Sequence, residues 1–246
     1  GDFNGDGITD VGIFTDGQWL IDLNGNGVWD DDDLWAKLGH RDDHPVTGDW
    51  DADGKTDIGI FGPAWIGDPR AIEAEPGMPD ARNERSGRHK NMPPEPGEAA
   101  IGWRRMKRTA TGKLRTDLID HVFHFGTAGD RAITGDWNGD GKSTIGVFRE
   151  GIWLLDVDGN GVWSDGDESV DYGSKNDLPV VGDFNGDGVD DVGVFRDGHW
   201  TIDSDGNRRF DATDEVFELG QPGDVPITGD FDGDGADQIG VFRKAG

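Results

Sequence analysis

One fourteen-residue segment occurs five times in this chain, and this repetition constrains the fold more than any other feature. The copies occupy residues 1–14, 48–61, 135–148, 182–195 and 229–242, and each runs from Gly-Asp-Phe/Trp to Gly-Ile/Val-Phe. Successive copies begin 47, 87, 47 and 47 residues apart. The interval of 87 equals one repeat of 47 plus an insertion of 40 residues. The chain is therefore expected to be a repeat protein with one interrupted repeat.

Each repeat contains four short segments in which apolar and polar residues alternate, as they do in strands. In the repeat that starts near residue 178 we expect strands at 178–183, 191–196, 199–203 and 215–220, with a tight Asp197-Gly198 turn. No segment has the pattern of a helix. Four antiparallel strands in a unit of this length are typical of a propeller blade. We therefore predict an all-β, β-propeller-like array of four-stranded antiparallel blades. An open stack of hairpins and a pair of small sandwiches are the alternatives.

The repeat spacing predicts one repeat domain over residues 1–246, of about four and a half blades. The predicted blades are about 1–43, 44–130, 131–177 and 178–224, with a half blade at 225–246, and the second blade carries the insertion at about 62–115. The chain begins inside a repeat and shows no signal peptide, so we expect a mature or cut fragment. Both ends carry the second-strand segment, so either blades are missing or a terminal half-blade pairs with a neighbouring copy.

The charge of the chain narrows the classes of function. Asp and Glu total 51 against 23 Lys and Arg, which gives a formal net charge of −28. A compact fold with this charge repels itself, so we expect cations inside it. The 10 Trp and 12 Phe argue against a disordered acidic chain. Nucleic acid needs a basic footprint and is not expected as a partner. No apolar run is long enough to span a membrane, and the absence of cysteine excludes disulfides and thiolate metal sites.

Every copy of the repeated segment contains a loop of the pattern Asp-x-Asp/Asn-x-Asp-Gly-x-x-Asp, called here the first loop. Side chains at positions 1, 3 and 5 face a common centre, position 6 turns sharply, position 7 offers its carbonyl and position 9 completes the shell. Hard oxygen ligands of this number suit Ca²⁺. The predicted ligands are Asp2, Asn4, Asp6, Ile8 and Asp10; Asp49, Asp51, Asp53, Lys55 and Asp57; Asp136, Asn138, Asp140, Lys142 and Thr144; Asp183, Asn185, Asp187, Val189 and Asp191; and Asp230, Asp232, Asp234, Ala236 and Gln238. A metal-free Asp-Gly turn is the alternative.

Two positions of the first loop carry further predictions. Thr144 and Gln238 replace Asp at position 9, and we expect the third copy to bind calcium most weakly, because it has one carboxylate fewer and one Asn. Position 2 is always aromatic and is predicted to pack in the core, with sugar stacking as the alternative. These aromatic residues are Phe3, Trp50, Trp137, Phe184 and Phe231.

A second acidic loop lies between the third and fourth strands of three repeats. Its residues at positions 1, 3, 5, 9 and 12 have the ligand spacing of an EF-hand loop without the flanking helices. The predicted ligands are Asp22, Asn24, Asn26, Val28, Asp30 and Asp33; Asp156, Asp158, Asn160, Val162, Ser164 and Asp167; and Asp203, Asp205, Asn207, Arg209, Asp211 and Asp214. Arg208 stands where Gly is expected, which lowers the expectation for the third set. Lys113 in the interrupted repeat should exclude calcium. A solvated acidic turn is the alternative.

Together the five first loops and three second loops allow up to about eight Ca²⁺. Eight ions would change the formal charge from −28 to −12, which a soluble fold tolerates.

The five segments resemble FG-GAP/VCBS-type repeats, which build the β-propeller of integrin α chains and of many bacterial secreted proteins. The resemblance covers residues 1–61 and about 117–243. It implies that the first loop joins the two innermost strands of a blade and binds calcium. It also implies a secreted or cell-surface protein, of the bacterial kind, with an adhesive or structural role. Thr144 and Gln238 depart from the family motif.

The insertion differs from the rest of the chain in being basic. Trp103, Arg104, Arg105, Lys107 and Arg108 form a cluster that we expect to dock on another copy or on an anionic polysaccharide. The terminal half-blades and this arm together suggest a head-to-tail homo-oligomer or filament. A solvated loop is the alternative.

The sequence favours an extracellular scaffold or binding module over an enzyme. The six histidines form no zinc-like pair and no Ser-His arrangement, and the loops account for most carboxylates. A lectin-like, carbohydrate-binding propeller is the alternative function, and a polysaccharide-active enzyme on a propeller is a weaker one.

Overall fold

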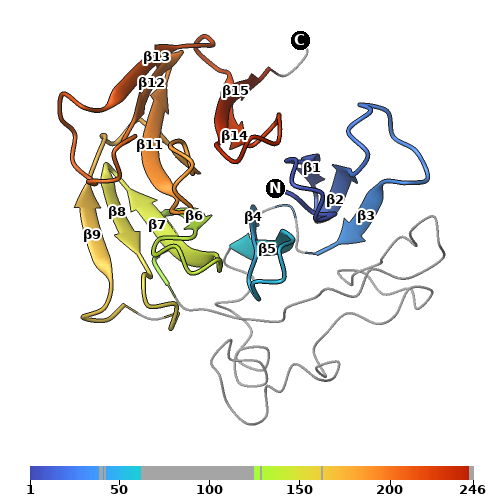
Figure 1. Ribbon diagram of the computed structural model, residues 1–246, viewed down its shortest axis with the longest axis horizontal. Coiled ribbons are helices and arrows are strands. Elements are labelled where there is room, and N and C mark those ends of the chain that lie inside the picture. Colours follow the sequence, from blue (N-terminus) through green and yellow to red (C-terminus); the bar gives the residue numbers. More distant parts are fainter. Residues whose placement is uncertain (39–40, 42, 62–124, 128, 162, 244–246) are drawn as a thin grey trace. The chain divides into compact units, whose positions relative to one another are not determined.

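The computed structural model describes residues 1–38, 41, 43–61, 125–127, 129–161 and 163–243 (Figure 1). Within these residues the protein has fifteen strands and no helix, which confirms the predicted all-β class. No helix in this part of the chain has the length and hydropathy needed to cross a membrane. The predicted insertion and its basic cluster lie outside the described residues.

The residues divide by their contacts into two compact units. The first comprises Gly1–Asp6 and Asp10–His124, and the second comprises Gly7–Thr9 and Phe125–Gly246. The first unit holds β1 (Val11–Thr15), β2 (Gln18–Asp22), β3 (Leu34–Lys37), β4 (His44–Gly48) and β5 (Asp57–Phe61). These strands form one sheet in the order β1-β2-β3 and a β4-β5 hairpin.

The second unit contains two complete four-stranded sheets and a hairpin. The first sheet is β6 (Arg131–Gly135), β7 (Thr144–Arg149), β8 (Ile152–Leu155) and β9 (Glu168–Asp171). The second is β10 (Leu178–Gly182), β11 (Asp191–Arg196), β12 (His199–Ile202) and β13 (Glu215–Glu218), and β14 (Val225–Gly229) pairs with β15 (Gln238–Phe242). All neighbours are antiparallel and follow chain order.

The strands of the second complete sheet lie where the sequence predicts them. Strand β11 has the expected bounds, and β10, β12 and β13 end one or two residues earlier than expected. The predicted turn between β11 and β12 places both Asp197 and Gly198 at positive φ, 53° and 97°. A type I′ turn needs this conformation at both central residues, and its twist matches that of the flanking strands.

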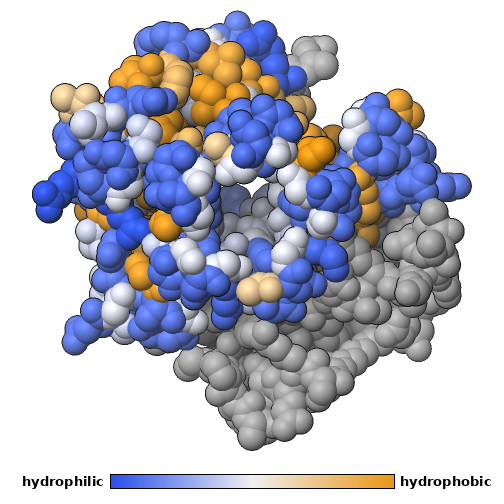
Figure 2. Space-filling view, viewed as in Figure 1, coloured by the Kyte–Doolittle hydropathy of each residue, from blue (hydrophilic) through white to orange (hydrophobic). Residues whose placement is uncertain are grey.

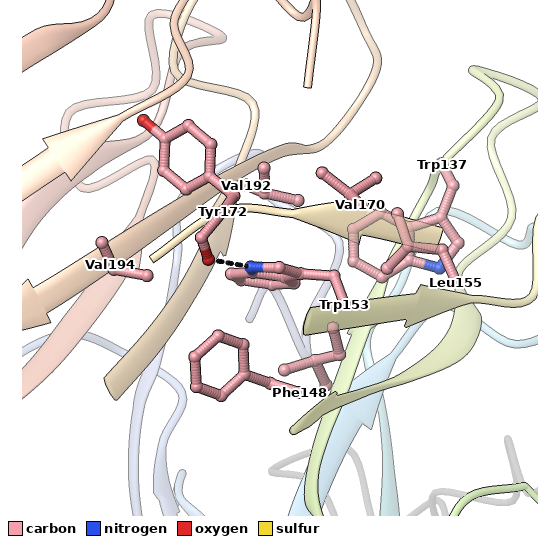
Figure 3. Close-up of a cluster of buried hydrophobic side chains, with 9 residues drawn as sticks. Trp137, Phe148, Trp153, Leu155, Val170, Tyr172, Val192 and Val194 are labelled. Atoms are coloured by element: carbon pink, nitrogen blue, oxygen red, sulfur yellow. Dashed lines mark hydrogen bonds between the residues drawn. The ribbon is translucent and has the colours of Figure 1, made fainter. Parts of the chain in front are cut away.

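The core of each complete sheet is built around the tryptophan of its third strand. Trp153 is fully buried, and its Nε1 donates to the carbonyl of Tyr172 at 2.8 Å (Figure 3). The ring of Phe148 packs edge-on at 5.2 Å between centroids. Val192 and Val194 of the following sheet cover the same cluster. Consecutive sheets of the second unit therefore share an apolar core.

The same arrangement recurs around two other tryptophans. Trp200 donates to the carbonyl of Leu219 at 2.8 Å, and Val241 of the following hairpin packs against its cluster. In the first unit, Trp19 packs in a cluster that Ile60 of β5 covers. Burial of these large rings removes a large apolar area from water, which stabilises the fold.

The position-2 aromatic residues pack as expected. Phe3 and Trp137 are buried, at 3% exposure each. Trp50, Phe184 and Phe231 are half-buried. This agrees with a packing role for the set.

An ion pair between a half-exposed Arg and a buried Asp ties the start of each complete sheet to the end of its second strand. In the β6–β9 sheet, Nε and Nη2 of Arg149 donate to the two carboxylate oxygens of Asp130, both at 2.6 Å. Although burial opposes it, this bidentate bond and the amide of Thr127 lower the pKa of Asp130. The Arg196–Asp177 pair and the Arg243–Asp224 pair repeat the arrangement. The sequence reading did not anticipate this clamp.

On the face drawn in Figure 2, the described residues are mostly hydrophilic, with a few apolar patches. Exposed apolar side chains include Val11 and Ile13 of β1, at 56% and 57%. The residues at the same positions of the fourth copy are Val192 and Val194 of β11, and they are 0% and 8% exposed. The difference arises because the preceding sheet covers β11.

Candidate metal-binding loops

The first loop joins the first two strands of a sheet, so its position is set by strand pairing. It connects β4 to β5, β6 to β7, β10 to β11 and β14 to β15, and the earliest copy precedes β1. In these hairpins the glycine that ends the first strand pairs with the position-9 residue, as Gly182 does with Asp191. The register therefore brings the two ends of each loop together.

Within the first loop, side-chain oxygens accept hydrogen bonds from backbone amides of the same loop. In the fourth copy, Asp183 accepts hydrogen bonds from the amides of Gly186 at 2.7 Å and Gly188 at 2.8 Å. Asn185 Oδ1 accepts from the amide of Asp187 at 2.9 Å. Both glycines have positive φ, 73° and 86°, which side chains other than glycine rarely adopt. Position 4 also has positive φ, as a glycine in four copies and as Ala52 at 59° in the second, and the sequence prediction did not include this.

In two copies of the first loop the three predicted carboxylates converge. Asp49, Asp51 and Asp53 bring ligand oxygens within 4.8 Å of one another, and Asp230, Asp232 and Asp234 do the same. Such groups could hold a metal ion. The other three copies have Asn at position 3, so they have two carboxylates among positions 1, 3 and 5.

The position-9 side chain can accept a hydrogen bond from the position-2 amide, which links the end of the first loop to its start. Asp10 Oδ2 accepts the amide of Phe3 at 2.8 Å, although burial raises the pKa of Asp10 to about 6. Burial, with the charge of Asp51 adding, raises the pKa of Asp57 to about 7. Burial, followed by the charge of Asp203, raises the pKa of Asp191 to about 7. These carboxylates would be stabilised by a nearby cation.

The two departures at position 9 use their side chains differently. Thr144 is buried, and its hydroxyl donates to the carbonyl of Asp156 at 2.7 Å. Gln238 Oε1 accepts the amide of Phe231 at 2.7 Å, as Asp10 does in the first copy, while its Nε2 donates to Ala236 O. The Gln238 amide therefore occupies the Ala236 carbonyl that was predicted as a ligand. A cation at this copy would compete with the Gln238 amide for that carbonyl.

The second loop joins the third strand of a sheet to the fourth. Its position-1 Asp accepts the position-6 amide, as Asp156 does from Gly161 at 2.9 Å. Its position-12 Asp accepts the position-9 amide, as Asp214 does from Asp211 at 2.9 Å. Two of the three copies bring ligand oxygens within 4.8 Å of one another: Asp156, Asp158 and Asp167, and Asp203, Asp205 and Asp214.

The second loop at residues 22–33 is arranged differently. The side-chain amides of Asn24 and Asn26 both donate to Oδ2 of Asp30, at 3.2 and 2.8 Å. Its position-12 residue, Asp33, accepts the amide of Asp30 at 2.7 Å. These side-chain hydrogen bonds stabilise the Asp30 carboxylate, and Asn207 of the third copy does the same for Asp211 at 3.2 Å.

Several carboxylate oxygens in these loops are buried without a hydrogen-bond partner among the described residues. They are Asp22 Oδ1, Asp33 Oδ1, Asp191 Oδ2, Asp203 Oδ1 and Asp214 Oδ1. Asp203 is 0% exposed and Asp33 is 2% exposed. A buried carboxylate oxygen without a donor is costly, so each such atom in a folded protein needs an explanation.

Arg208 takes the place of the expected glycine without disrupting its loop. It adopts φ 58°, and its amide donates to Asp203 Oδ2 at 2.5 Å, as the glycine does elsewhere. Its guanidinium pairs with Glu168 and donates to the carbonyl of Trp137 at 2.7 Å. The cationic group thus lies against the preceding repeat.

The two loops of one repeat are linked by a contact that the sequence reading missed. The side-chain amide of the position-3 Asn donates to the position-2 carbonyl of the second loop: Asn4 to Leu23 at 2.7 Å, Asn138 to Val157 at 3.0 Å and Asn185 to Ser204 at 3.3 Å. A signal for it was present, because Asn occupies position 3 in all three copies that a second acidic loop follows.

The remaining predicted site residues are backbone carbonyls, two side chains of the loop at residues 156–167, and the docking cluster of the insertion. The carbonyls of Ile8, Lys55, Lys142, Val189, Val28 and Arg209 stay predictions, and Val162 lies outside the described residues. Ser164 Oγ donates to Asp158 Oδ2 at 2.9 Å, and Asn160 Nδ2 reaches Ser164 at 3.4 Å. Trp103, Arg104, Arg105, Lys107 and Arg108 also lie outside the described residues.

Comparison with known proteins adds no family assignment. No family model matches the chain, and no curated protein matches it either.

Proposed function

We propose that this chain is an extracellular, calcium-binding repeat scaffold of the FG-GAP/VCBS type, with a structural or adhesive role and no enzymatic activity. The observation that carries the proposal is the set of buried carboxylate oxygens without hydrogen-bond donors in the second loops. Asp203 and Asp214 each have such an oxygen, and both belong to a cluster whose ligand oxygens lie within 4.8 Å of one another.

A cation resolves the energetic conflict in these loops. In each second-loop cluster one carboxylate is buried, one is half-buried and one is exposed. The buried carboxylate is repelled most strongly by its neighbours, because the interior screens charge less than water does. The loops offer only oxygen ligands, in the number and with the flexibility that Ca²⁺ prefers; Mg²⁺ demands a stricter octahedron, and Zn²⁺ favours nitrogen and sulfur. Up to about eight ions would also offset more than half of the net charge of −28.

Hydrogen bonds between successive first loops support a propeller-like array. The position-8 amide of one loop donates to the position-1 carbonyl of the loop before it. In the second unit, Asp190 donates to Asp136 at 2.8 Å and Asp237 to Asp183 at 2.7 Å; in the first unit, Thr56 donates to Asp2 at 2.7 Å. Cations in these loops would therefore stabilise the contacts between repeats as well as each hairpin.

Metal analysis with calorimetry tests the calcium proposal. After dialysis against trace calcium at pH 7.5, elemental analysis should find several Ca²⁺ per chain, and chelation should lower the melting temperature. Excess Mg²⁺ should not restore it fully, because its coordination is less adaptable. Asp214→Asn should remove about one ion, and Asp165→Asn, outside the ligand set, should remove none. A chain that holds no ion and melts identically after chelation would refute the proposal.

The scaffold role includes self-association through the basic insertion. Light scattering after size exclusion, at low and high salt with calcium present, tests this part. We expect oligomers that salt dissociates, because a basic arm on an acidic surface is screened by ions. A strict monomer under both conditions would contradict it and leave calcium binding intact.

A lectin-like function is the second candidate, favoured by aromatic rings at position 8 of the second loops. Trp29, Trp163 and Phe210 occupy this position and are 50%, 52% and 67% exposed. Exposed rings beside carboxylates can stack on sugars and accept their hydroxyls. A glycan array in calcium should show ligands that Trp163→Ala loses, whereas Ile152→Ala, at a similarly exposed aliphatic residue, should keep them. Turnover of a bound glycan would instead favour the enzymatic alternative.

A further inference from the structure

The two acidic loops of the repeat spanning residues 178–220 lie against each other. The amide of Asp203, at the start of the second loop, donates to the carbonyl of Val192 at 3.0 Å. Val192 directly follows Asp191, the last ligand position of the first loop. A methyl group placed on Gly206 of the second loop would lie 3.4 Å from Asp191 Oδ1. The pairing of β11 with β12 therefore brings position 9 of the first loop into contact with the second.

Asn185 adds a side-chain link between these loops. Its Oδ1 accepts the amide of Asp187 inside the first loop, and its Nδ2 donates to Ser204 O in the second. A carboxylate cannot make the second bond, because it has no proton to donate. Asp51 stands at this position in the copy whose repeat carries the insertion and no acidic second loop. The link through Asn thus occurs in the three repeats that contain both acidic loops.

Two buried carboxylate oxygens of this repeat have no hydrogen-bond donor among the described residues. Asp191 Oδ2 belongs to the first loop, and Asp203 Oδ1 belongs to the second. The two residues are 3% and 0% exposed, so water does not compensate them. The charge of Asp203 is among the causes that raise the pKa of Asp191, which places the two carboxylates within electrostatic reach.

We propose that the two loops form one two-cation site, in which Asp191 is a ligand shared by both cations and Asn185 holds the loops together. This inference rests on the proposed calcium binding and deepens it. A shared carboxylate lies between two dications and offsets their mutual repulsion. Occupation of one loop therefore positions Asp191 for the other, and each cation raises the affinity for its neighbour by the same factor.

The preceding repeat provides a natural contrast. Thr144 stands where Asp191 does, and its hydroxyl donates to the carbonyl of Asp156, the first residue of the second loop. A methyl placed on Gly159, the counterpart of Gly206, would meet Thr144 Cγ2 at 3.1 Å. The loops touch in the same way, but no carboxylate lies between them. The two loops of that repeat should bind cations independently.

Calcium titration of the full chain, followed by NMR at individual amides, tests the shared ligand. The amides of Gly188 and Arg208 report the two loops, because each donates to the position-1 Asp of its own loop. In the unchanged protein both resonances should shift with one midpoint. Asp191→Thr should raise both midpoints at least about tenfold, the scale of losing a supporting group at a metal site. Thr144→Asp should bring the midpoints of the preceding repeat together.

The outcomes separate this inference from the proposed function. If Asp191→Thr raises the Gly188 midpoint and leaves that of Arg208 unchanged, the ligand is not shared and calcium binding stands. If neither amide of the unchanged protein responds to calcium while elemental analysis still finds bound ions, the two-cation site fails and calcium binding by other loops stands; if no ion is found either, both proposals fail.

Asn185→Asp provides a second test, because the side chain is exposed and the substitution is nearly isosteric. A count of ligand charges predicts tighter binding from the added carboxylate. The linked site predicts a higher Arg208 midpoint instead, because the bond to Ser204 is lost. Asp51→Asn, in the copy whose repeat has no acidic second loop in its sequence, is the matched control and should leave the Arg208 midpoint unchanged. An unchanged or lower midpoint in Asn185→Asp would overturn the role of Asn185.

Discussion

The calcium-free protein should become less stable as pH rises from 5 to 8, and Asp191 offers a direct way to measure this. Burial, followed by the charge of Asp203, raises the pKa of Asp191 from 3.8 to about 7. The folded carboxyl thus binds its proton more tightly than the unfolded one. The stabilisation from this proton is complete below about pH 4 and is lost as pH rises through about 7.

The size of the effect follows from the interval between the folded pKa and the experimental pH. Each pKa unit corresponds to about 1.4 kcal/mol, so the two units between pH 7 and pH 5 give about 3 kcal/mol. For a chain of this length, that change in the free energy of unfolding shifts the melting temperature by about 6 to 12 °C.

The assay compares calcium-depleted protein with Asp191→Asn by calorimetry at pH 5 and pH 8. The variant is needed because the net charge of −28 also favours low pH. At pH 8 without calcium, Asp191→Asn should melt higher than the unchanged protein by about this shift, and at pH 5 the two should agree. Saturating calcium at pH 8 should reverse the order, because the cation then stabilises the carboxylate. A variant no more stable than the unchanged protein at pH 8 without calcium would refute the reasoning.

Three further predictions concern stability in saturating calcium, measured by urea unfolding. Trp153→Ala should lower the free energy of unfolding by about 3 to 5 kcal/mol, since its fully buried ring would leave a cavity; a loss below 1 kcal/mol would contradict the shared core. Arg149→Met should cost about 1 to 2 kcal/mol by leaving the buried Asp130 without its bidentate partner, whereas exposed Arg131→Met should have little effect. Gly188→Ala should cost about 1 to 2 kcal/mol from backbone strain alone, because its φ is 86° and an added methyl meets nothing within 4 Å.

The strands and turns of the complete sheets could be predicted from the sequence, because neighbouring residues determine them. The strands of the β10–β13 sheet follow period-two alternation, and the turn at Asp197-Gly198 follows from the positive φ that these residues tolerate. The convergence of Asp49, Asp51 and Asp53 was also predictable, since the three lie within five residues on one tight loop. The propeller-like arrangement and the identity of the ion stay predictions.

The contacts between loops needed the tertiary structure. Asn185 and Ser204 are 19 residues apart, and only the pairing of β11 with β12 brings them together. The same holds for the clamp between Arg149 and Asp130, which spans a whole hairpin. Spacing along the chain carries no information about such pairs until the strand register is known.

The burial of equivalent residues shows most clearly what the sequence determines and what the tertiary structure determines. Val11 and Val192 occupy the same position of the repeat, between an Asp and a Gly, yet they are 56% and 0% exposed. The sequence alone determined that both stand in a strand next to a metal-type loop, because hydrophobic alternation and loop chemistry are properties of adjacent residues. Tertiary structure decided which of them is covered, because removing a side chain from water depends on the sheet that packs over it.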